Sequence, residues 1–346
     1  MKIALYIGRF RFPLKPSDIG VECFKTIRNS KHEIVALLVE SGDPLASLGT
    51  QCGLDVITLP PELHAPVAEM RQYFSSPPFT ENVERFLERL HDADPDIGVV
   101  YCGGWIPPAM RVTVPLGFIN LHPGPLPELS GFDPEKFMIL NDDPASYGTV
   151  HRTADLFDTG NILAFTERVP LSPHITTPEL ATLISRVGFR TVLEVLDRAT
   201  DPKSLLGTPQ DESRRGYATR KQGYIESVIR WNEDSHRKLD SRLRAFNSLD
   251  DGMPLKLFQD GKYVIVYDLE THGGDFPGRP GDQIGRYAGE GDFHDAPIFR
   301  TIEGAAVLQV GPVIDSHDSD FLLPEERLIG PGPRPMKTKI ECFEMM

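Results

Sequence analysis

The chain has 346 residues and carries 36 Lys and Arg against 50 Asp and Glu, for a net charge of -14. This excess of acid favours solubility and disfavours broad nucleic-acid binding, which needs a basic surface. Apolar residues make up 40% of the chain, and no run approaches the roughly 18 apolar residues of a membrane-spanning helix. A length of 346 residues is typical of two globular domains.

The first residues and the cysteines of the chain argue against a signal peptide and against a metal site. The first residues, MKIALYIGRF, lack a long apolar segment followed by small residues, so we expect no signal peptide. The four cysteines are far apart and form no Cys-x-x-Cys pair, which disfavours a disulfide framework or a zinc site. We therefore expect a cytoplasmic protein with no metal.

The first third of the chain alternates between short apolar runs and amphipathic segments. The apolar runs predict buried strands, and the apolar spacing at Val83, Phe86 and Leu90 is typical of a helix. Alternation of this kind predicts a parallel sheet with crossover helices. The predicted strands are 1–8, 33–40, 56–60, 97–104 and 117–124, and the predicted helices are 19–30 and 82–97.

The remainder of the chain divides into a continuation of this pattern and a β-rich part. Strands are predicted at 146–153 and 162–171, with a long helix at 177–199. The polar stretch 207–223 has no apolar period and is interpreted as a linker. A helix is predicted within 231–248, and the strands after it, separated by Gly- and Pro-rich turns, suggest a small barrel or sandwich.

Three polar residues stand where chemistry is expected in such a sheet. Asn120 and His122 alternate on a strand, so their side chains point the same way, close to the strand's carboxyl end. Asp158 lies in a Phe-Asp-Thr-Gly loop between two apolar strands. Acyl transfer to an amine passes through a tetrahedral oxyanion, which an Asn amide can stabilise, and it needs a base such as His that a carboxylate can orient. Taken alone, the same residues also suit a structural strand end and a turn.

Two segments carry a resemblance to a known family. FINLHPGPLPELSG resembles the signature strand and loop of the formyltransferases that use 10-formyltetrahydrofolate, and YGTVHRTADLFDTGNIL resembles their second signature. The two occur in the family's order, and Asn120 and Asp158 are 38 positions apart. The segment 217–231 and the RAFN stretch that follows resemble the linker and carboxy-terminal barrel of methionyl-tRNA formyltransferase.

The resemblance implies an organisation for the whole chain. It implies an α/β fold, with a Rossmann-like parallel-sheet catalytic domain followed by a small OB-like β-barrel. The implied boundaries are 1–206 for the catalytic domain, 207–230 for the linker, 231–330 for the β-rich domain and 331–346 for a tail.

It also implies roles for the three polar residues. Asn120 would polarise the formyl oxygen, and His122 would be the general base. Asp158 would tune His122 or hold a water that shuttles protons. His151, which matches the His of the second signature, would have a supporting role.

The cofactor implied by the resemblance is 10-formyltetrahydrofolate. Main-chain groups after the strand 97–104 would border its pterin, and the loop 154–157 would close the other side. Trp105 is equally well interpreted as a core aromatic. The candidate cofactor-binding residues are Gly104, Trp105, Ile106, Pro107, Asp155 and Phe157.

The sequence departs from the family where the acceptor is chosen. The transfer RNA enzymes carry an Arg-Gly-Ala-type sequence after the Leu-Pro, whereas this chain has the acidic Glu128 and Asp133 nearby. Residues 231–330 contain 19 Asp and Glu against 10 Lys and Arg, so this region lacks the basic excess that gripping a transfer RNA needs. The loop 8–18 lacks the Gly-Ser-Asn-type phosphate cradle of glycinamide ribonucleotide transformylase.

We therefore expect N-formyl transfer to a small amine, foremost an amino sugar carried on a nucleotide. The alternative acceptors are methionyl-tRNA, a modified amino acid, and water, which would make the protein a formyltetrahydrofolate hydrolase. A different hypothesis is a binding protein without catalytic activity. Arg9, Arg11 and Lys15 are interpreted as a solvated loop or, alternatively, as contacts to an anionic acceptor. Arg214 and Arg215 are interpreted as part of a solvated linker. The sequence is compatible with a homodimer. Neither a membrane nor nucleic acid is expected as a partner.

Overall fold

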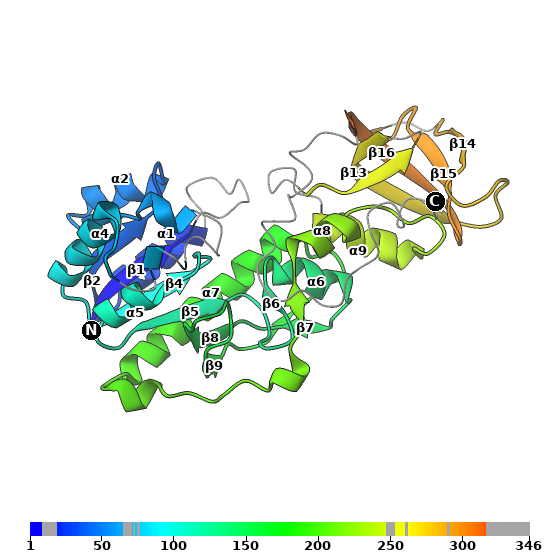
Figure 1. Ribbon diagram of the computed structural model, residues 1–346. Helices are drawn as coiled ribbons and strands as arrows, with labels where there is room; N and C mark the ends of the chain where they lie inside the picture. The colour runs from blue at the N-terminus through cyan, green and yellow to red at the C-terminus, as the bar shows by residue number, and fades with distance from the viewer. Residues whose placement is uncertain are drawn as a thin grey trace. The chain divides into compact units, whose positions relative to one another are not determined.

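A computed structural model describes the chain at residues 1–8, 19–64, 71, 73–74, 77–246, 253–259, 262–288 and 291–315. Its residues form two compact units, shown in Figure 1. The first unit comprises Met1–Pro134, Ala145–Pro170 and Ala181–Tyr217, and the second comprises the remaining segments. Within the described ranges, no helix is both long enough and apolar enough to cross a membrane.

A seven-stranded sheet forms the centre of the first unit. Its strands lie in the order β3 (Asp55–Thr58), β2 (Glu33–Val39), β1 (Lys2–Ile7), β4 (Ile97–Tyr101), β5 (Phe118–His122), β8 (Thr149–Arg152) and β9 (Ile162–Phe165). The strands from β3 to β5 are parallel, as predicted. The last two strands run antiparallel to their neighbours, a direction that apolar patterning alone does not specify.

Helices cover both faces of this sheet. On one face, Leu5 and Leu37 pack with α1 (Ile19–Arg28), α2 (Pro44–Gln51) and the part of α7 (Thr177–Arg198) that lies in this unit. On the other face, Tyr6 and Leu38 pack with α4 (Glu81–Asp92) and α5 (Pro108–Thr113). Successive strand residues point to opposite faces, so runs that are apolar at every position are buried on both sides.

Several short elements lie between the longer strands and helices along the chain. They are η1 (Pro61–His64), β6 (Ser130–Gly131), α6 (Pro134–Leu140), β7 (Ala145–Ser146), β10 (Val169–Pro170), η2 (Pro202–Leu205), η3 (Glu212–Arg214) and β11 (Tyr217–Ala218). β11 pairs with β6, and β10 pairs with β7. The polar segment interpreted as a linker thus contains defined structure, and its first part packs with the first unit.

The second unit contains a curled antiparallel sheet. Its strands lie in the order β12 (Lys256–Gln259), β13 (Lys262–Gly273), β16 (Gly304–Asp315), β15 (Pro297–Arg300) and β14 (Gln283–Arg286). Register shifts between β13 and β16 mark the irregularities that let long strands bend. The predicted class, an α/β part followed by a small β-rich part, is confirmed.

A buried ionic network lies beside the helices of this unit, α8 (Arg220–Glu226) and α9 (His236–Phe246). Arg242 is fully buried, and its Nε donates to Asp234 Oδ2 over 2.9 Å. Its Nη1 donates to Glu226 Oε2 over 2.8 Å. Asp234 also accepts from the Arg230 main-chain N–H at 2.7 Å. The guanidinium therefore bridges two carboxylates, and Arg230 adds a second positive charge at Glu226.

Removing this guanidinium tests the network. We expect Arg242→Met to destabilise the second unit by about 3–5 kcal/mol, because the buried Asp234 loses its ion-pair partner and Glu226 keeps only Arg230. Arg237→Met on the same helix is the control, since the Arg237 side chain is 79% exposed and its ion pair with Asp142 contributes little. Denaturant unfolding of the full chain measures both, and an unchanged midpoint for Arg242→Met contradicts the prediction.

Candidate active site

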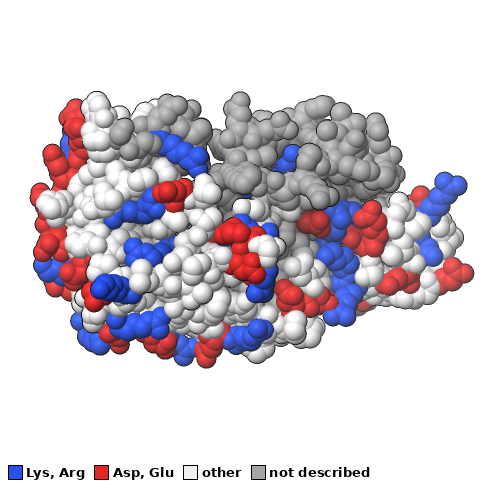
Figure 2. Space-filling model, turned by 60° about the horizontal axis from the view of Figure 1, so that its bottom comes forward, with Lys and Arg blue, Asp and Glu red and all other residues white. Residues whose placement is uncertain are grey.

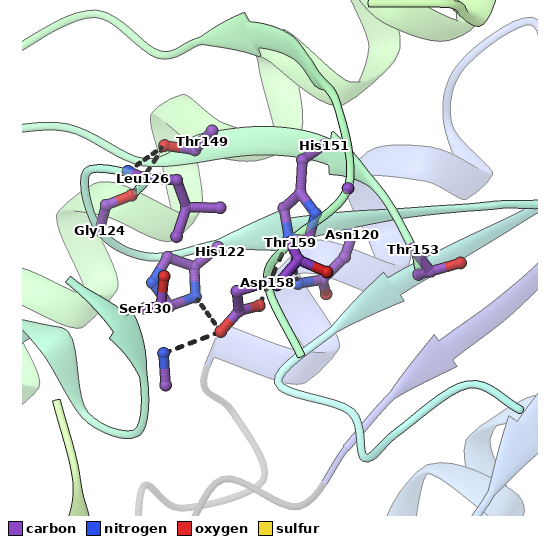
Figure 3. A network of polar contacts seen from close by, with 12 residues as sticks. Asn120, His122, Gly124, Leu126, Ser130, Thr149, His151, Thr153, Asp158 and Thr159 are labelled. Carbon is purple, nitrogen blue, oxygen red and sulfur yellow. Dashed lines mark hydrogen bonds and ion pairs between the residues drawn. The ribbon is translucent and has the colours of Figure 1, made fainter. Parts of the chain in front are cut away.

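β5 carries Asn120 and His122 to one side of the sheet. Ile119 and Leu121, which alternate with them, are buried in the apolar cluster on the opposite face. The loop after β5 is anchored by the buried Thr149, whose hydroxyl donates to the Gly124 carbonyl over 2.8 Å and accepts from the Leu126 N–H at 3.2 Å (Figure 3). The strand and its loop therefore hold His122 in place from both ends.

The antiparallel strand β8 adds a second histidine. His151 is the register partner of Asn120. Its Nδ1–H donates to the Arg152 carbonyl over 2.8 Å, because a carbonyl can only accept. Neutral His151 therefore carries its lone pair on Nε2, which accepts from Asn120 Nδ2 at 3.0 Å. This contact uses one of the two amide hydrogens of Asn120 and sets the direction of its side chain.

Asp158 is brought to the same place by the loop between β8 and β9. Its Oδ2 accepts from the Gly131 N–H at 2.9 Å and lies 3.5 Å from His122 Nδ1. Its Oδ1 lies 3.4 Å from His151 Nε2. The carboxylate, whose side chain is 9% exposed, is thus enclosed between two imidazoles (Figure 3).

The Asp-Thr-Gly sequence has a backbone reason as well as a chemical one. Asp158 has φ of 55°, the left-handed region that Asp and Asn tolerate better than other non-glycine residues. A Cβ at Gly160 would lie 1.8 Å from the Arg152 carbonyl oxygen, so only glycine fits there. The chain therefore reverses tightly beside β8 and directs the Asp158 carboxylate at the histidines.

Burial and charge act in opposite directions on the pKa values of this group. Burial lowers the pKa of His122 below its usual 6.5, and the Asp158 carboxylate only partly offsets this. Burial alone would raise the pKa of Asp158, but His122, His151 and the Gly131 N–H outweigh it and lower the pKa instead. At neutral pH the site therefore holds an ionised Asp158 and a neutral His122.

The tautomer of His122 follows from its other neighbour. His122 Nε2 lies 2.7 Å from the Leu129 carbonyl, to which it can only donate. The basic lone pair is then on Nδ1, the nitrogen that faces Asp158. A proton taken up at Nδ1 would lie against an ionised carboxylate, which favours the charged imidazolium.

The segments predicted to bind the cofactor lie against one another. Trp105 is 6% exposed in an apolar cluster, to which Phe157 adds, and its indole N–H donates to the Asp155 carbonyl over 3.2 Å. The Asp155 carboxylate pairs with Arg111, and the Gly104 N–H donates to the Tyr6 hydroxyl over 3.3 Å.

Two further predicted residues complete that segment. Ile106 is buried in the apolar cluster under α4 and α5, and Pro107 occupies the N-cap position of α5 without a side-chain hydrogen bond to the helix. The nearby pocket of about 370 Å³ is lined by Pro108, Arg111, Val112, Val114, Pro115, Gly117, Phe118, Arg152 and Thr153. Arg9, Arg11 and Lys15, interpreted either as a solvated loop or as contacts to an anionic acceptor, lie outside the described residues.

The sequence did not reveal three polar residues that surround Asp158. Ser130, Gln210 and Arg215 contact one another or the Asp158 main chain. The Arg215 side chain is 6% exposed, so its interpretation as part of a solvated linker is wrong. A polar segment without an apolar period gives no signal that one of its arginines is buried.

Comparison with known proteins identifies the domain that contains this site. Residues 60–196 match the formyl transferase family. The methionyl-tRNA formyltransferase of Chlamydia caviae is 30% identical over 205 residues, which cover 58% of this chain and 62% of that protein. That of Borreliella afzelii is 29% identical over 286 residues, which cover 77% of this chain and 85% of that protein. The first of these matches thus spans less than two thirds of the relative's length.

Solved structures share the fold at low sequence identity. An N-formyltransferase from Helicobacter canadensis, in complex with folinic acid and dTDP-3-aminofucose, aligns with a TM-score of 0.58 and 16% identity over 90% of this chain and all of that chain. HypX from Aquifex aeolicus aligns with a TM-score of 0.57 and 14% identity over 91% of this chain and 44% of that chain. Both likenesses show the fold, and the residues that match the formyl transferase family, 60–196, include Asn120, His122 and Asp158.

Proposed function

We propose that this chain transfers a formyl group from 10-formyltetrahydrofolate to a primary amine of a small molecule, most favourably an amino sugar carried on a nucleotide. The observation that carries the proposal is the convergence of Asn120, His122 and Asp158 from β5 and the loop before β9. The match of residues 60–196 to the formyl transferase family supports the reaction, and the charge of the chain supports a small acceptor.

The three side chains have the properties that such a transfer requires. The neutral His122 can accept the proton that the amine loses, since its lone pair faces the carboxylate that stabilises the resulting charge. The second amide hydrogen of Asn120 can stabilise negative charge developing on the formyl oxygen. Asp158 stays ionised throughout, because its lowered pKa keeps the proton on the imidazole.

The residues available for the donor fit a flat, polar heterocycle. The segments 104–107 and 155–157 meet at the Trp105 to Asp155 hydrogen bond. Peptide groups and the Asp155 and Arg111 side chains supply both donors and acceptors. 10-Formyltetrahydrofolate, held by these segments, would supply the activated formyl group.

Charge favours a small acceptor over transfer RNA. Residues 231–330 carry 19 acidic against 10 basic side chains, and the face shown in Figure 2 has acidic and basic groups intermixed. Glu128, in the loop that follows His122, is offset by its ion pair with Arg214, so the argument depends on the acidic carboxy-terminal region instead. The complex of the Helicobacter canadensis enzyme with dTDP-3-aminofucose supports a nucleotide-linked amino sugar as the acceptor proposed here.

A binding and turnover screen tests the donor and the acceptor together. We expect 5-formyltetrahydrofolate to raise the melting temperature, and one amino-sugar nucleotide to raise it further, since each ligand that binds the folded state stabilises it. Folate turnover that needs no amine would favour the hydrolase. Formylation of charged methionyl-tRNA, or of a modified amino acid, in place of every sugar would replace the acceptor, and no effect of folate would overturn the proposal.

Substitution of the two strand residues tests their roles. We expect His122→Asn to lower kcat by about 10²–10⁴-fold, because the proton acceptor is lost. Asn120→Ala should lower kcat by about 10²–10³-fold, because a donor to the developing charge is lost. Steady-state kinetics with the active acceptor measures both. His91→Asn, at an exposed position of α4, is the matched control, and equal losses in it and in His122→Asn would refute the role of His122.

The pH dependence follows from the direction of the His122 pKa shift. The base works when neutral, so kcat/KM should rise with pH up to the His122 pKa and level off above it. Because burial lowers that pKa, the midpoint should lie below 6.5. Asp158 raises the His122 pKa, so Asp158→Asn should move the midpoint to still lower pH. A profile of kcat/KM at constant ionic strength decides, and a midpoint above 6.5 would contradict the assignment.

A further inference from the structure

Arg215 is buried among polar groups of the first unit. Its Nη1 donates to Ser130 Oγ over 2.7 Å and to the Asp158 main-chain oxygen over 3.3 Å. Its Nη2 donates to Gln210 Oε1 over 3.0 Å, and Glu212 accepts from both Nε and Nη2 at 2.6 Å. One guanidinium thus joins the loop after β5, the loop before β9 and the segment that precedes β11.

Gln210 holds the same loop through its other end. Its Nε2 donates to the Asp158 main-chain oxygen over 2.8 Å and to the Gly160 main-chain oxygen over 2.7 Å. Its Oε1 is fixed by Arg215. The carbonyl of Asp158 therefore receives two side-chain donors, while its carboxylate faces the histidines.

The backbone of Asp158 needs such support. A non-glycine residue with φ of 55° is held in a sparsely populated conformation, which persists only where its surroundings fix it. Relaxation of this residue would rotate its peptide group and its side chain together. The carboxylate contacts with His122 and His151, at 3.5 and 3.4 Å, depend on that rotation.

The same guanidinium also fixes the other partner of the carboxylate. The Ser130 hydroxyl is held by Arg215, and the Ser130 N–H donates to the Gly216 carbonyl over 3.2 Å. The next residue, Gly131, supplies the N–H that Asp158 Oδ2 accepts. Arg215 thus sets the relative position of donor and acceptor in that bond.

We propose that Arg215 and Gln210 are positioning residues that orient the Asp158 carboxylate toward His122 and His151 by holding the Asp158 carbonyl and the Ser130–Gly131 strand. The inference rests on the proposed formyl transfer for its kinetic consequence and on geometry for the rest. Neither side chain has to touch a substrate for this role. The segment 210–215 therefore belongs to the candidate active site.

The kinetic test compares Arg215→Met with Asp158→Asn and with their combination. Arg215→Met should lower kcat by about 10²-fold, the effect of a small misplacement of a reacting group, with little change in KM. In the Asp158→Asn background the same change should cost almost nothing, because Arg215 acts through that carboxylate. Arg215→Lys should restore part of kcat. Arg190→Met, an exposed arginine on α7 paired with Glu167, is the control expected to be neutral.

A second readout does not depend on any activity. Selective ¹⁵N labelling of histidine lets the ring of His122 be titrated by NMR, with His122→Asn used for assignment. Because Asp158 raises the His122 pKa, Arg215→Met should move the His122 titration in the same direction as Asp158→Asn, toward lower pH. Gln210→Met, which removes the other donor, gives the same test if Arg215→Met does not fold.

The outcomes separate this inference from the proposed function. Shifted titration in both variants supports positioning even if the wild type transfers no formyl group. An unchanged His122 titration in folded Arg215→Met and Gln210→Met overturns it, whatever the kinetics. Losses of kcat that add fully to that of Asp158→Asn overturn it as well, since they would reveal a role apart from the carboxylate.

Discussion

The buried carboxylate of Asp158 is the constraint around which this site is organised. An ionised group enclosed by protein is costly unless hydrogen bonds and opposite charge replace its water. Here the Gly131 main-chain N–H is the hydrogen-bond donor, and ring nitrogens of His122 and His151, at 3.5 and 3.4 Å, supply opposite charge when they carry a proton. The carboxylate in turn stabilises the imidazolium that forms when His122 takes up a proton. Stability and reactivity are therefore properties of the same few contacts.

The sheet topology explains how these groups come together. A parallel strand, β5, ends at the edge where ligands bind in open α/β sheets, and it delivers Asn120 and His122 there. The switch to antiparallel pairing at β8 lets a nearby stretch of chain return along β5, so that His151 faces Asn120 with a short connection. The tight reversal at Gly160 then adds Asp158 from the following loop. Three segments of one unit are thus sufficient to build the group.

Much of this was predictable from the sequence, for identifiable reasons. Strand and helix positions follow from apolar periodicity, and Asn120 and His122 could be placed together because side chains two apart on a strand share a face. Strand direction was not predictable, since β8 and β9 have the same apolar pattern whichever way they run. The burial of Arg215 was hidden as well, because its partners are main-chain oxygens and polar side chains that leave no apolar mark on the sequence.

The left-handed backbone at Asp158 has an evolutionary consequence. The position must satisfy two filters at once, a side chain that carries charge and a backbone that tolerates positive φ, and among the common residues aspartate meets both. Glutamate keeps the charge but strains the turn, whereas asparagine or glycine keeps the turn and loses the charge. We expect duplicated copies that lose their activity to keep the fold and to acquire asparagine or glycine at this position. The identity of this one residue would then distinguish active from inactive copies.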